Sequence, residues 1–237
     1  MNAFAITAII SLAIFTQTVS GFGVSLVAMS LLVNVMGIRE ATPLVALVAM
    51  TAELIILFHY RHAFNLRAVT RLAAAAVAGI PLGLIFLQQV EVEVVTTMLG
   101  VILLAYSLYS LLCPTLPHLD HPGWAYGFGF LGGILGGAYN TSGPPVIIYG
   151  TCRRWPPAEF KGNLQGFFML VSTLAAIGHV ISGNMTTAVW QNYLYAVPGI
   201  ALGSIVGFSL DKRIKPQHFR HIILILLLIL GVRLILN

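Results

Sequence analysis

Small polar residues interrupt the apolar sequence twice, and their types are those that bind anions. The first break (residues 17–23) contains Gln17, Thr18, Ser20, Gly21 and Gly23, and the second break (residues 140–145) contains Asn140, Thr141, Ser142, Gly143 and Pro144. Backbone groups freed inside a bilayer must be satisfied by protein, water or a ligand, so a repeated polar break predicts a binding site. The alternative is a capped helix junction whose hydroxyls bond back to their own helix.

The second break has the composition of a helix N-terminus. Pro144 and Pro145 suit the first turn of a helix, where a missing N–H costs nothing. Such a helix would direct its free amides, from Thr141 to Gly143, toward the bilayer midplane. Because a helix N-terminus carries partial positive charge and open donors, two such ends facing each other predict an anion site without arginine. Asn163 and Gln165 are expected to line the path beside this break, with helix–helix hydrogen bonding as the alternative.

Three titratable residues are candidates for coupling to protons. Glu53 is the carboxylate placed well inside an apolar segment. A proton carrier or the partner of a cation is one interpretation, and a purely structural hydrogen bond is the alternative. His59 and His179 stand near the ends of corresponding segments, where a histidine either titrates in a transport cycle or is simply solvated.

Other reactive side chains do not form recognisable sites. His118, Asp120 and His121 resemble metal ligands, but so short a cluster in a loop is more often solvated, and no metal site is predicted. Cys113 and Cys152 lack the spacing of metal ligands or of a disulfide framework. Nucleotide-binding, hydrolase and redox motifs are missing from the sequence, so we expect neither an enzyme nor a bound cofactor.

Composition indicates a polytopic helical membrane protein. Hydrophobic residues make up 58% of the chain and charged residues 8%, with a mean hydropathy of +0.94, which is too apolar for a soluble domain. Continuous apolar runs of about 20 residues exclude a transmembrane barrel, whose strands alternate over about ten. Residues 1–15 lack the features of a cleaved signal and are interpreted as the start of the first membrane segment. The net charge of +5 lies in loops, so a nucleic-acid partner is not expected.

The apolar segments form two blocks that resemble each other. Eight segments are expected, at residues 3–37, 41–60, 68–88, 94–113, 122–151, 160–181, 189–210 and 218–236. Segments one and five contain the breaks; Glu40 and Glu159 correspond near the start of the following segments. The sequence therefore predicts an all-α membrane protein of two inverted four-segment repeats (residues 1–113 and 122–237, joined by loop 114–121), each beginning with a broken or re-entrant hairpin. Gly132, Gly133, Gly136 and Gly137 are expected to form one small-residue face for helix packing.

Charge in the loops selects between two topologies. Basic residues gather at 61–71, 153–161 and 212–220, and the positive-inside rule places such loops on the cytoplasmic side. If all eight segments crossed the membrane, the first two of these loops would lie on opposite sides. If segments one and five are re-entrant hairpins, all three loops lie inside, so the sequence predicts six crossing helices and two hairpins.

The glycine-rich stretch 132–145, which ends in Gly-Pro-Pro, carries a family resemblance. Together with residues 20–23 and Lys161-Gly162-Asn163, it resembles the TauE/SafE family of sulfite exporters, also called the toluene sulfonate uptake permease family. The resemblance covers nearly the whole chain, although the first break departs from the glycine cluster and proline found in many members. It implies movement of sulfite, sulfoacetate, sulfonates or related organic anions across a bacterial inner membrane, in a direction that the resemblance does not fix.

The predicted function is a secondary transporter of a small sulfur-containing or organic anion that works by alternating access. Coupling to protons is left open, with Glu53 as the first residue to test. A passive anion channel and a permease for thiosulfate or carboxylates are the alternatives. The expected partners are the anion, the lipid bilayer and protons, and self-association into a homo-oligomer is left open.

Overall fold

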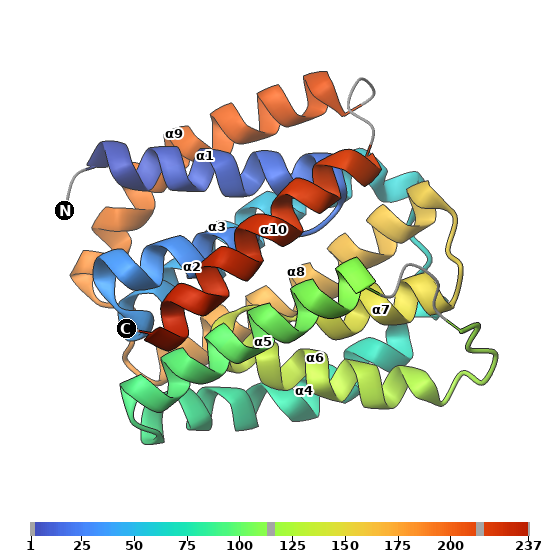
Figure 1. The fold of residues 1–237 in the computed structure, drawn as a ribbon, viewed down its shortest axis with the longest axis horizontal. Helices are drawn as coiled ribbons and strands as arrows, with labels where there is room; N and C mark the ends of the chain where they lie inside the picture. The colour runs from blue at the N-terminus through green and yellow to red at the C-terminus, as the bar shows by residue number, and fades with distance from the viewer. Residues whose placement is uncertain (1–2, 113–116, 212–215, 237) are drawn as a thin grey trace.

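The protein is a bundle of helices that run roughly parallel to one axis (Figure 1). The computed structural model describes residues 3–112, 117–211 and 216–236, and no strand occurs within them. The elements are α1 (Ala3–Ser20), α2 (Val24–Met36), α3 (Ile38–Tyr60), the 3-10 turn η1 (Arg61–Ala63), α4 (Leu66–Gln89), α5 (Val92–Leu112), α6 (Trp124–Tyr139), α7 (Gly143–Cys152), α8 (Pro157–Ile181), α9 (Thr187–Leu210) and α10 (Pro216–Leu236).

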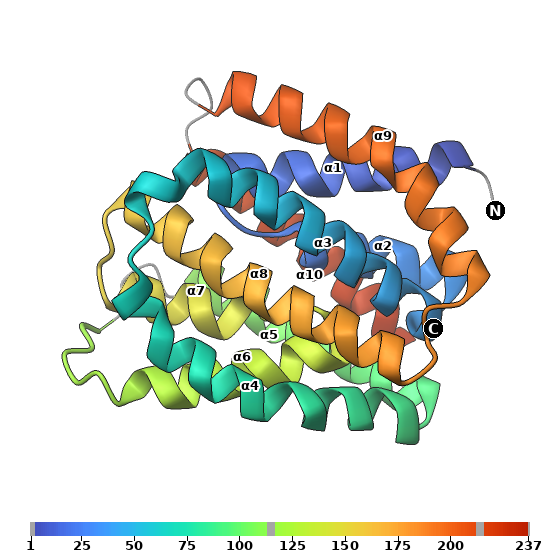
Figure 2. The ribbon, with the colours of Figure 1, turned by 180° about the vertical axis from the view of Figure 1, so that it is seen from behind.

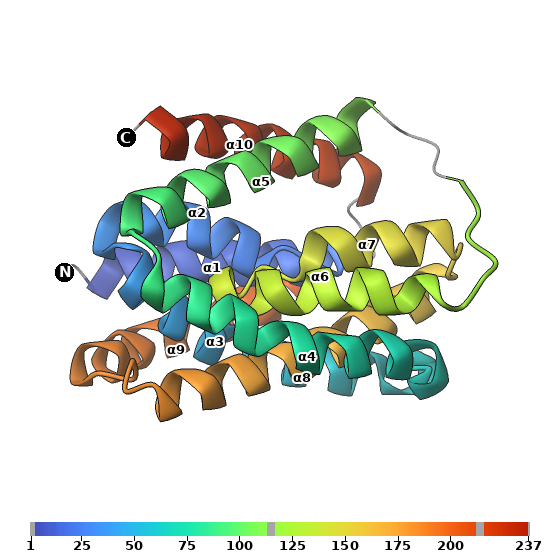
Figure 3. The same ribbon diagram turned by 90° about the horizontal axis from the view of Figure 1, so that it is seen from below.

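Both breaks turn the chain back on itself. Figure 1 shows α2 returning alongside α1 from one end of the bundle, and α7 returning alongside α6 from the opposite end. Seen from below, the helices of these two hairpins lie between the pair α5–α10 and the layer that contains α3, α4, α8 and α9 (Figure 3). The hairpin tips are therefore covered on both sides by longer helices.

Among the described residues, six helices are long and apolar enough to cross a membrane. This confirms the prediction of a multi-pass membrane protein. The six helices are α1, α3 with η1 (Ile38–Ala63), α4, α5, α8 and α9. The set differs from expectation at two places: α1 qualifies although it is half of a hairpin, and the described apolar part of α10 (His221–Leu236) is shorter. With 18 residues, α1 is about 27 Å long, so the first break lies deeper than the middle of the bundle.

Basic residues of two connections gather at one end, which we call the basic end. Figure 1 places residues 61–71, residues 153–161 and the end of α9 there. The α2–α3 junction, residues 90–91 and residues 182–186 lie at the opposite end. The third basic loop falls largely outside the described residues.

Glycine allows several helix pairs to approach closely, but the expected four-glycine face is split in two. Gly133 and Gly137 face α4, where a Cβ atom would overlap the carbonyl oxygens of Ala76 and Ile80. Gly132 and Gly136 instead face α7 and α8, because residues one position apart point about 100° away from each other on a helix. Another close pair is α1–α9 (Figure 2), where a Cβ atom at Gly203 would lie 2.6 Å from the Ser11 carbonyl oxygen.

Candidate functional site

In the first break, two glycines end one helix and begin the next. Gly21 and Gly23 have φ angles of 83° and 115°, which side-chain-bearing residues rarely adopt. The Gly21 amide still donates to the Gln17 carbonyl oxygen at 2.7 Å, so α1 closes normally before the chain turns. Helix α2 then starts at Val24 with its N-terminus inside the protein.

In the second break, an asparagine ends one helix before the next begins. Asn140 has a φ angle of 51°, a left-handed conformation that asparagine tolerates better than most residues. Its amide donates to the Gly136 carbonyl at 2.8 Å, and the Thr141 amide donates to the Leu135 carbonyl at 3.1 Å, which together cap α6. Helix α7 begins at Gly143 with Pro144 and Pro145 in its first turn, as expected.

The two breaks meet around a buried cavity of about 20 Å³, which we call the central cavity. Asn140 Nδ2 lies 3.4 Å from Ser25 Oγ, a contact between the two hairpins. The N-termini of α2 and α7 both border this cavity, because Gly23 and Ser25 belong to one and Ser142 and Gly143 to the other. Its full lining is Gln17, Gly23, Ser25, Leu26, Glu53, Asn140, Thr141, Ser142, Gly143 and Phe168.

Two glutamines hold the first break in place. Gln17 Oε1 accepts from the Val24 amide at 2.8 Å, and its Nε2 donates to Gln165 Oε1 at 2.9 Å. Gln165 Nε2 in turn donates to the Gly21 carbonyl at 2.8 Å. This arrangement, the Gln17–Gln165 clasp, satisfies buried backbone groups on both sides of the turn. Gln165 therefore lies behind the first break and outside the cavity lining.

Fewer polar atoms at the second break make hydrogen bonds with other residues of the protein. Asn140 Oδ1 is buried and makes no hydrogen bond with any described residue, and Ser142 provides no side-chain cap for α7. Turning the Asn140 amide would let the Ser25 hydroxyl donate to Oδ1 and would leave Nδ2 as a free donor. With the Thr141 amide bonded to Leu135, the expected row of free amides is reduced to Ser142 and Gly143.

Glu53 also borders the central cavity. Its side chain is 2% exposed and lies beside the hydroxyl of Ser172 and the side-chain amide of Gln17. Glu53 Oε2 has no hydrogen-bond partner in the described part of the chain. An acid thus stands next to the helix N-termini, where its protonation would control the local charge.

Other sequence candidates lie away from the central cavity. The Thr18 hydroxyl bonds to the Ile14 carbonyl and its side chain faces Gly207 of α9, and the Ser20 hydroxyl bonds to the Thr16 carbonyl. Asn163 accepts from the Asn65 amide at 2.8 Å, tying α8 to the start of α4. Gly21 and Pro144 are buried beside the breaks without lining the cavity.

The two histidines are not brought to the cavity. His59 is exposed and stacks on Phe208 near the basic end, whereas His179 is buried at the opposite end with Nδ1 3.2 Å from Asn184 Nδ2. Their surroundings differ although their positions in the sequence correspond.

Ser25, Leu26, Phe168 and Ser172 were missed by the sequence analysis. Ser25 carried a usable signal, because it stands two residues after Gly23 of the first break and falls in the first turn of the next helix. The other three stand inside apolar segments, where nothing in the sequence indicates which face borders a cavity.

Metal-ligating side chains do not converge within the described residues. His118 Nε2 lies 3.0 Å from Asp120 Oδ1, and the aspartate is exposed to solvent. Cys152 is a buried free thiol, and Cys113 lies outside the described residues.

Comparison with known proteins places the chain in a family. A protein described as probable sulfite/organosulfonate exporter TauE, from Cupriavidus necator, is 24% identical over 228 residues, which cover 94% of this chain and 89% of that protein. No solved structure matches with statistical significance. The profile of the sulfite exporter TauE/SafE family matches residues 6–234. The chain belongs to the sulfite exporter TauE/SafE family, whose members are transporters and not enzymes.

Proposed function

We propose that this protein is a secondary transporter that moves a small sulfur-containing anion across the bacterial inner membrane. The observation that carries the proposal is the meeting of two helix N-termini at one buried cavity. Each N-terminus offers partial positive charge and backbone donors, so together they stabilise a small anion without a full positive charge. Ser25, Asn140 and Ser142 add side-chain donors.

The substrate class is the sulfite or sulfonate type. Such groups carry three oxygen atoms that suit several converging donors, and the relative from Cupriavidus necator is described as a sulfite/organosulfonate exporter. Sulfite itself, sulfoacetate and other organosulfonates all present this headgroup. Export is the direction that the name of the relative supports.

The arrangement of helices supports two inverted repeats, residues 1–113 and 122–237, joined by residues 114–121. Each contains a hairpin followed by three longer helices, and the two hairpins enter from opposite ends (Figures 1 and 2). The helix contacts follow the same correspondence between the repeats. Helix α1 packs on α9 of the second repeat, and its equivalent α6 packs on α4 of the first repeat. The contacts α3–α8 and α5–α10 each join two equivalent helices. We therefore interpret both hairpins as re-entrant and the basic end as cytoplasmic.

Transport requires the central cavity to open. A single water needs about 10–15 Å³ of such volume, so a cavity of about 20 Å³ is too small for sulfite. The structure thus corresponds to a closed state from which the two repeats open alternately toward each side. Alternating access around a fixed site is the usual consequence of inverted repeats.

Glu53 supplies the proton coupling. An ionised carboxylate about 4 Å from the bound anion would repel it by about 4 kcal/mol at an effective dielectric constant of about 20. Protonation of Glu53 removes that repulsion, so the proton and the anion bind together. Binding of the anion should consequently strengthen as the pH falls. Because the proton gradient across a bacterial inner membrane is directed inward, net export by this route follows the outward concentration gradient of the anion.

The direct test is flux of radiolabelled sulfite or sulfoacetate in proteoliposomes, with and without a pH gradient. We expect saturable flux that a pH gradient accelerates, and counterflow of labelled against unlabelled anion. Absence of anion-dependent flux from folded protein would refute transport. Flux without saturation or counterflow would instead establish the alternative, a passive channel.

Glu53→Gln separates coupling from binding. Glutamine resembles the protonated acid, so this variant should still exchange labelled anion while its flux loses the dependence on the pH gradient. Retention of the full pH dependence would assign coupling to another group.

A further inference from the structure

A second cavity of about 550 Å³ adjoins the first break at the basic end; we call it the vestibule. Ser20 and Phe22 line the vestibule, whereas Gly23, the residue directly after Phe22, lines the central cavity, so the backbone of the first break borders both spaces. On the opposite wall, Ile147 lines the vestibule and its side chain lies against Gly143 of the central cavity. The vestibule therefore lies directly on the route from the basic end to the central cavity.

The residues that line the vestibule include two cations. Arg154 and Lys161 line it, together with the hydroxyls of Ser20 and Thr151, and no Asp or Glu stands among its described lining residues. The remaining walls are apolar or aromatic and include Trp155 and Phe160. Cations set against low-dielectric walls concentrate anions from solution.

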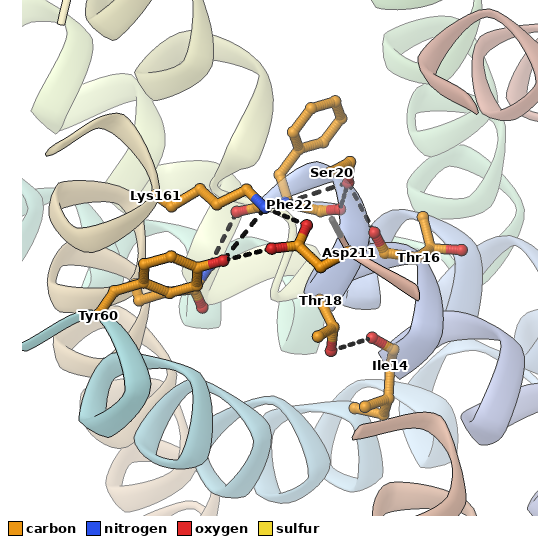
Figure 4. A network of polar contacts seen from close by, with 10 residues as sticks. Ile14, Thr16, Thr18, Ser20, Phe22, Tyr60, Lys161 and Asp211 are labelled. Carbon is orange, nitrogen blue, oxygen red and sulfur yellow. Dashed lines mark hydrogen bonds and ion pairs between the residues drawn. The ribbon is translucent and has the colours of Figure 1, made fainter. Parts of the chain in front are cut away.

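Lys161 is held by an ion pair with Asp211 (Figure 4). Its Nζ lies 2.6 Å from Asp211 Oδ1 and 3.3 Å from the Tyr60 hydroxyl, which itself donates to Asp211 Oδ2 at 2.7 Å. The side chains of Lys161 and Asp211 are 13% and 17% exposed, so solvent and a solute can reach the pair. The stem of Lys161 lies against Gly21, where a Cβ atom would be 2.9 Å from its Cγ. Gly21 of the first break thus makes room for this lysine.

Arg154 adopts an uncommon backbone conformation. Its φ angle is 51°, and within the described residues Asn140 of the central cavity is the other non-glycine residue with positive φ. The turn is closed by the Arg154 amide on the Thr151 carbonyl at 3.0 Å and by the Trp155 amide on the Gly150 carbonyl at 3.2 Å. Glycine or asparagine would fit this conformation with less strain, so the arginine side chain is the feature that needs explanation.

We propose that the vestibule is a second anion-binding site, in which Arg154 and Lys161 bind an oxyanion before it passes the first break. The guanidinium of Arg154 offers paired donors that match two oxygens of a sulfite-type group. Lys161 exchanges Asp211 for the anion, while the Tyr60 hydroxyl keeps one oxygen of Asp211 bonded. Passage onward requires Phe22 and Ile147 to separate. The identity of the anion rests on the proposed function, but the binding site does not.

Trp155 provides a local reporter for this site. The chain has three tryptophans, and Trp124 and Trp190 are 54% and 48% exposed, so Trp124→Phe and Trp190→Phe leave Trp155 as the sole emitter. We expect its fluorescence in detergent-solubilised protein to change saturably with sulfite and not with chloride at equal ionic strength. Arg154→Gly, which suits the backbone, and Lys161→Gln should each weaken this binding at least about tenfold.

Matched variants make the result specific. Arg153→Gln removes the neighbouring charge, which bonds to the Leu119 and Asp120 carbonyls and does not line the vestibule, and should leave the response unchanged. Lys161→Arg should retain it. If Lys161→Gln is unstable because Asp211 loses its ion pair, Lys161→Gln with Asp211→Asn tests the same cation.

The outcomes separate this site from the central cavity. Ser142→Leu should abolish flux and retain the Trp155 response. Three outcomes would overturn the proposal. The parent protein could show no saturable response, Ser142→Leu could lose the response, or Arg154→Gly and Lys161→Gln could both keep it. A saturable response from protein that shows no flux would refute transport and leave the vestibule site intact.

Discussion

The two breaks solve one structural problem in different ways. Each ends a helix inside the protein and starts another, but the first relies on two glycines with positive φ and on the Gln17–Gln165 clasp. The second closes with its own backbone, through Asn140 in the left-handed region and the Thr141 amide on Leu135. Side chains hold the first break, whereas the backbone holds the second.

This difference assigns separate tasks to the two breaks. At the first break, both ends of the Gln17 amide are bonded to protein atoms. At the second break, Asn140 Oδ1 is buried without a described partner, and Ser142 makes no capping bond. Buried polar groups are normally satisfied, and the Asn140 amide, once turned so that Oδ1 accepts from Ser25, leaves Nδ2 as a donor for an anion. We therefore infer that the second break provides side-chain ligands and the first break mainly provides the scaffold and backbone.

The largest effect is expected for Ser142→Leu. A leucine side chain would fill a central cavity of about 20 Å³ and block the anion, so flux should be abolished. Overpacking of this kind costs about 1–3 kcal/mol of stability, which should leave membrane insertion intact. Flux and thermal unfolding of the same preparation are the measurements.

Ser209→Leu is the matched control, because Ser209 is an exposed residue of α9 whose hydroxyl bonds to the Val206 carbonyl. It should transport normally. Normal flux in Ser142→Leu would remove the second break from the anion site.

Gln17→Leu is expected to act on stability. It leaves the Val24 amide and Gln165 Oε1 buried without their partner, at about 1–3 kcal/mol for each group. Thermal unfolding should therefore begin on the order of 5–15 °C lower.

A double-mutant cycle with Gln165→Leu tests whether the two side chains act as one unit. The combined loss of stability should be smaller than the sum of the single losses, because each variant breaks the same clasp. If these variants kept the stability of the parent but transported the anion much more weakly, the first break would be the main source of ligands for the anion.

Asn140→Gly should show the opposite pattern. Glycine accepts a φ of 51°, so stability should change by less than about 1 kcal/mol. Loss of a side-chain ligand for an anion costs about 1.5–3 kcal/mol, which corresponds to roughly a 10- to 150-fold rise in the KM for flux. Asn34→Ala, at an exposed position of α2, serves as the control. A KM unchanged in Asn140→Gly would contradict the assignment of ligands to the second break.

The sequence predicted the helical membrane fold and the positions of both breaks because long apolar runs and polar interruptions are local signals. It did not show which side of each broken helix faces the cavity. Thr18 and Gln17 are adjacent in sequence, yet Gln17 lines the cavity and Thr18 packs against Gly207 of α9. Likewise Gln165 lies beside the first break and not the second, since helix α8 passes both. Such distinctions depend on helix rotation and pairing, which tertiary packing decides.

Thr18→Val should have the smallest effect and tests that distinction directly. The Thr18 hydroxyl donates to the Ile14 carbonyl of its own helix at 2.8 Å, a bond that is not needed to maintain the helix. Valine preserves the close approach to Gly207 and removes a single hydroxyl bond, so the loss of stability should stay within about 1 kcal/mol. Flux and KM should match those of the parent. Thr18→Leu, which is too large for the contact with α9, should lower stability and leave the KM of the folded protein unchanged. If Thr18→Val weakened substrate affinity as strongly as Asn140→Gly, α1 would have to rotate in the transport cycle, and both breaks would supply side-chain ligands to the anion.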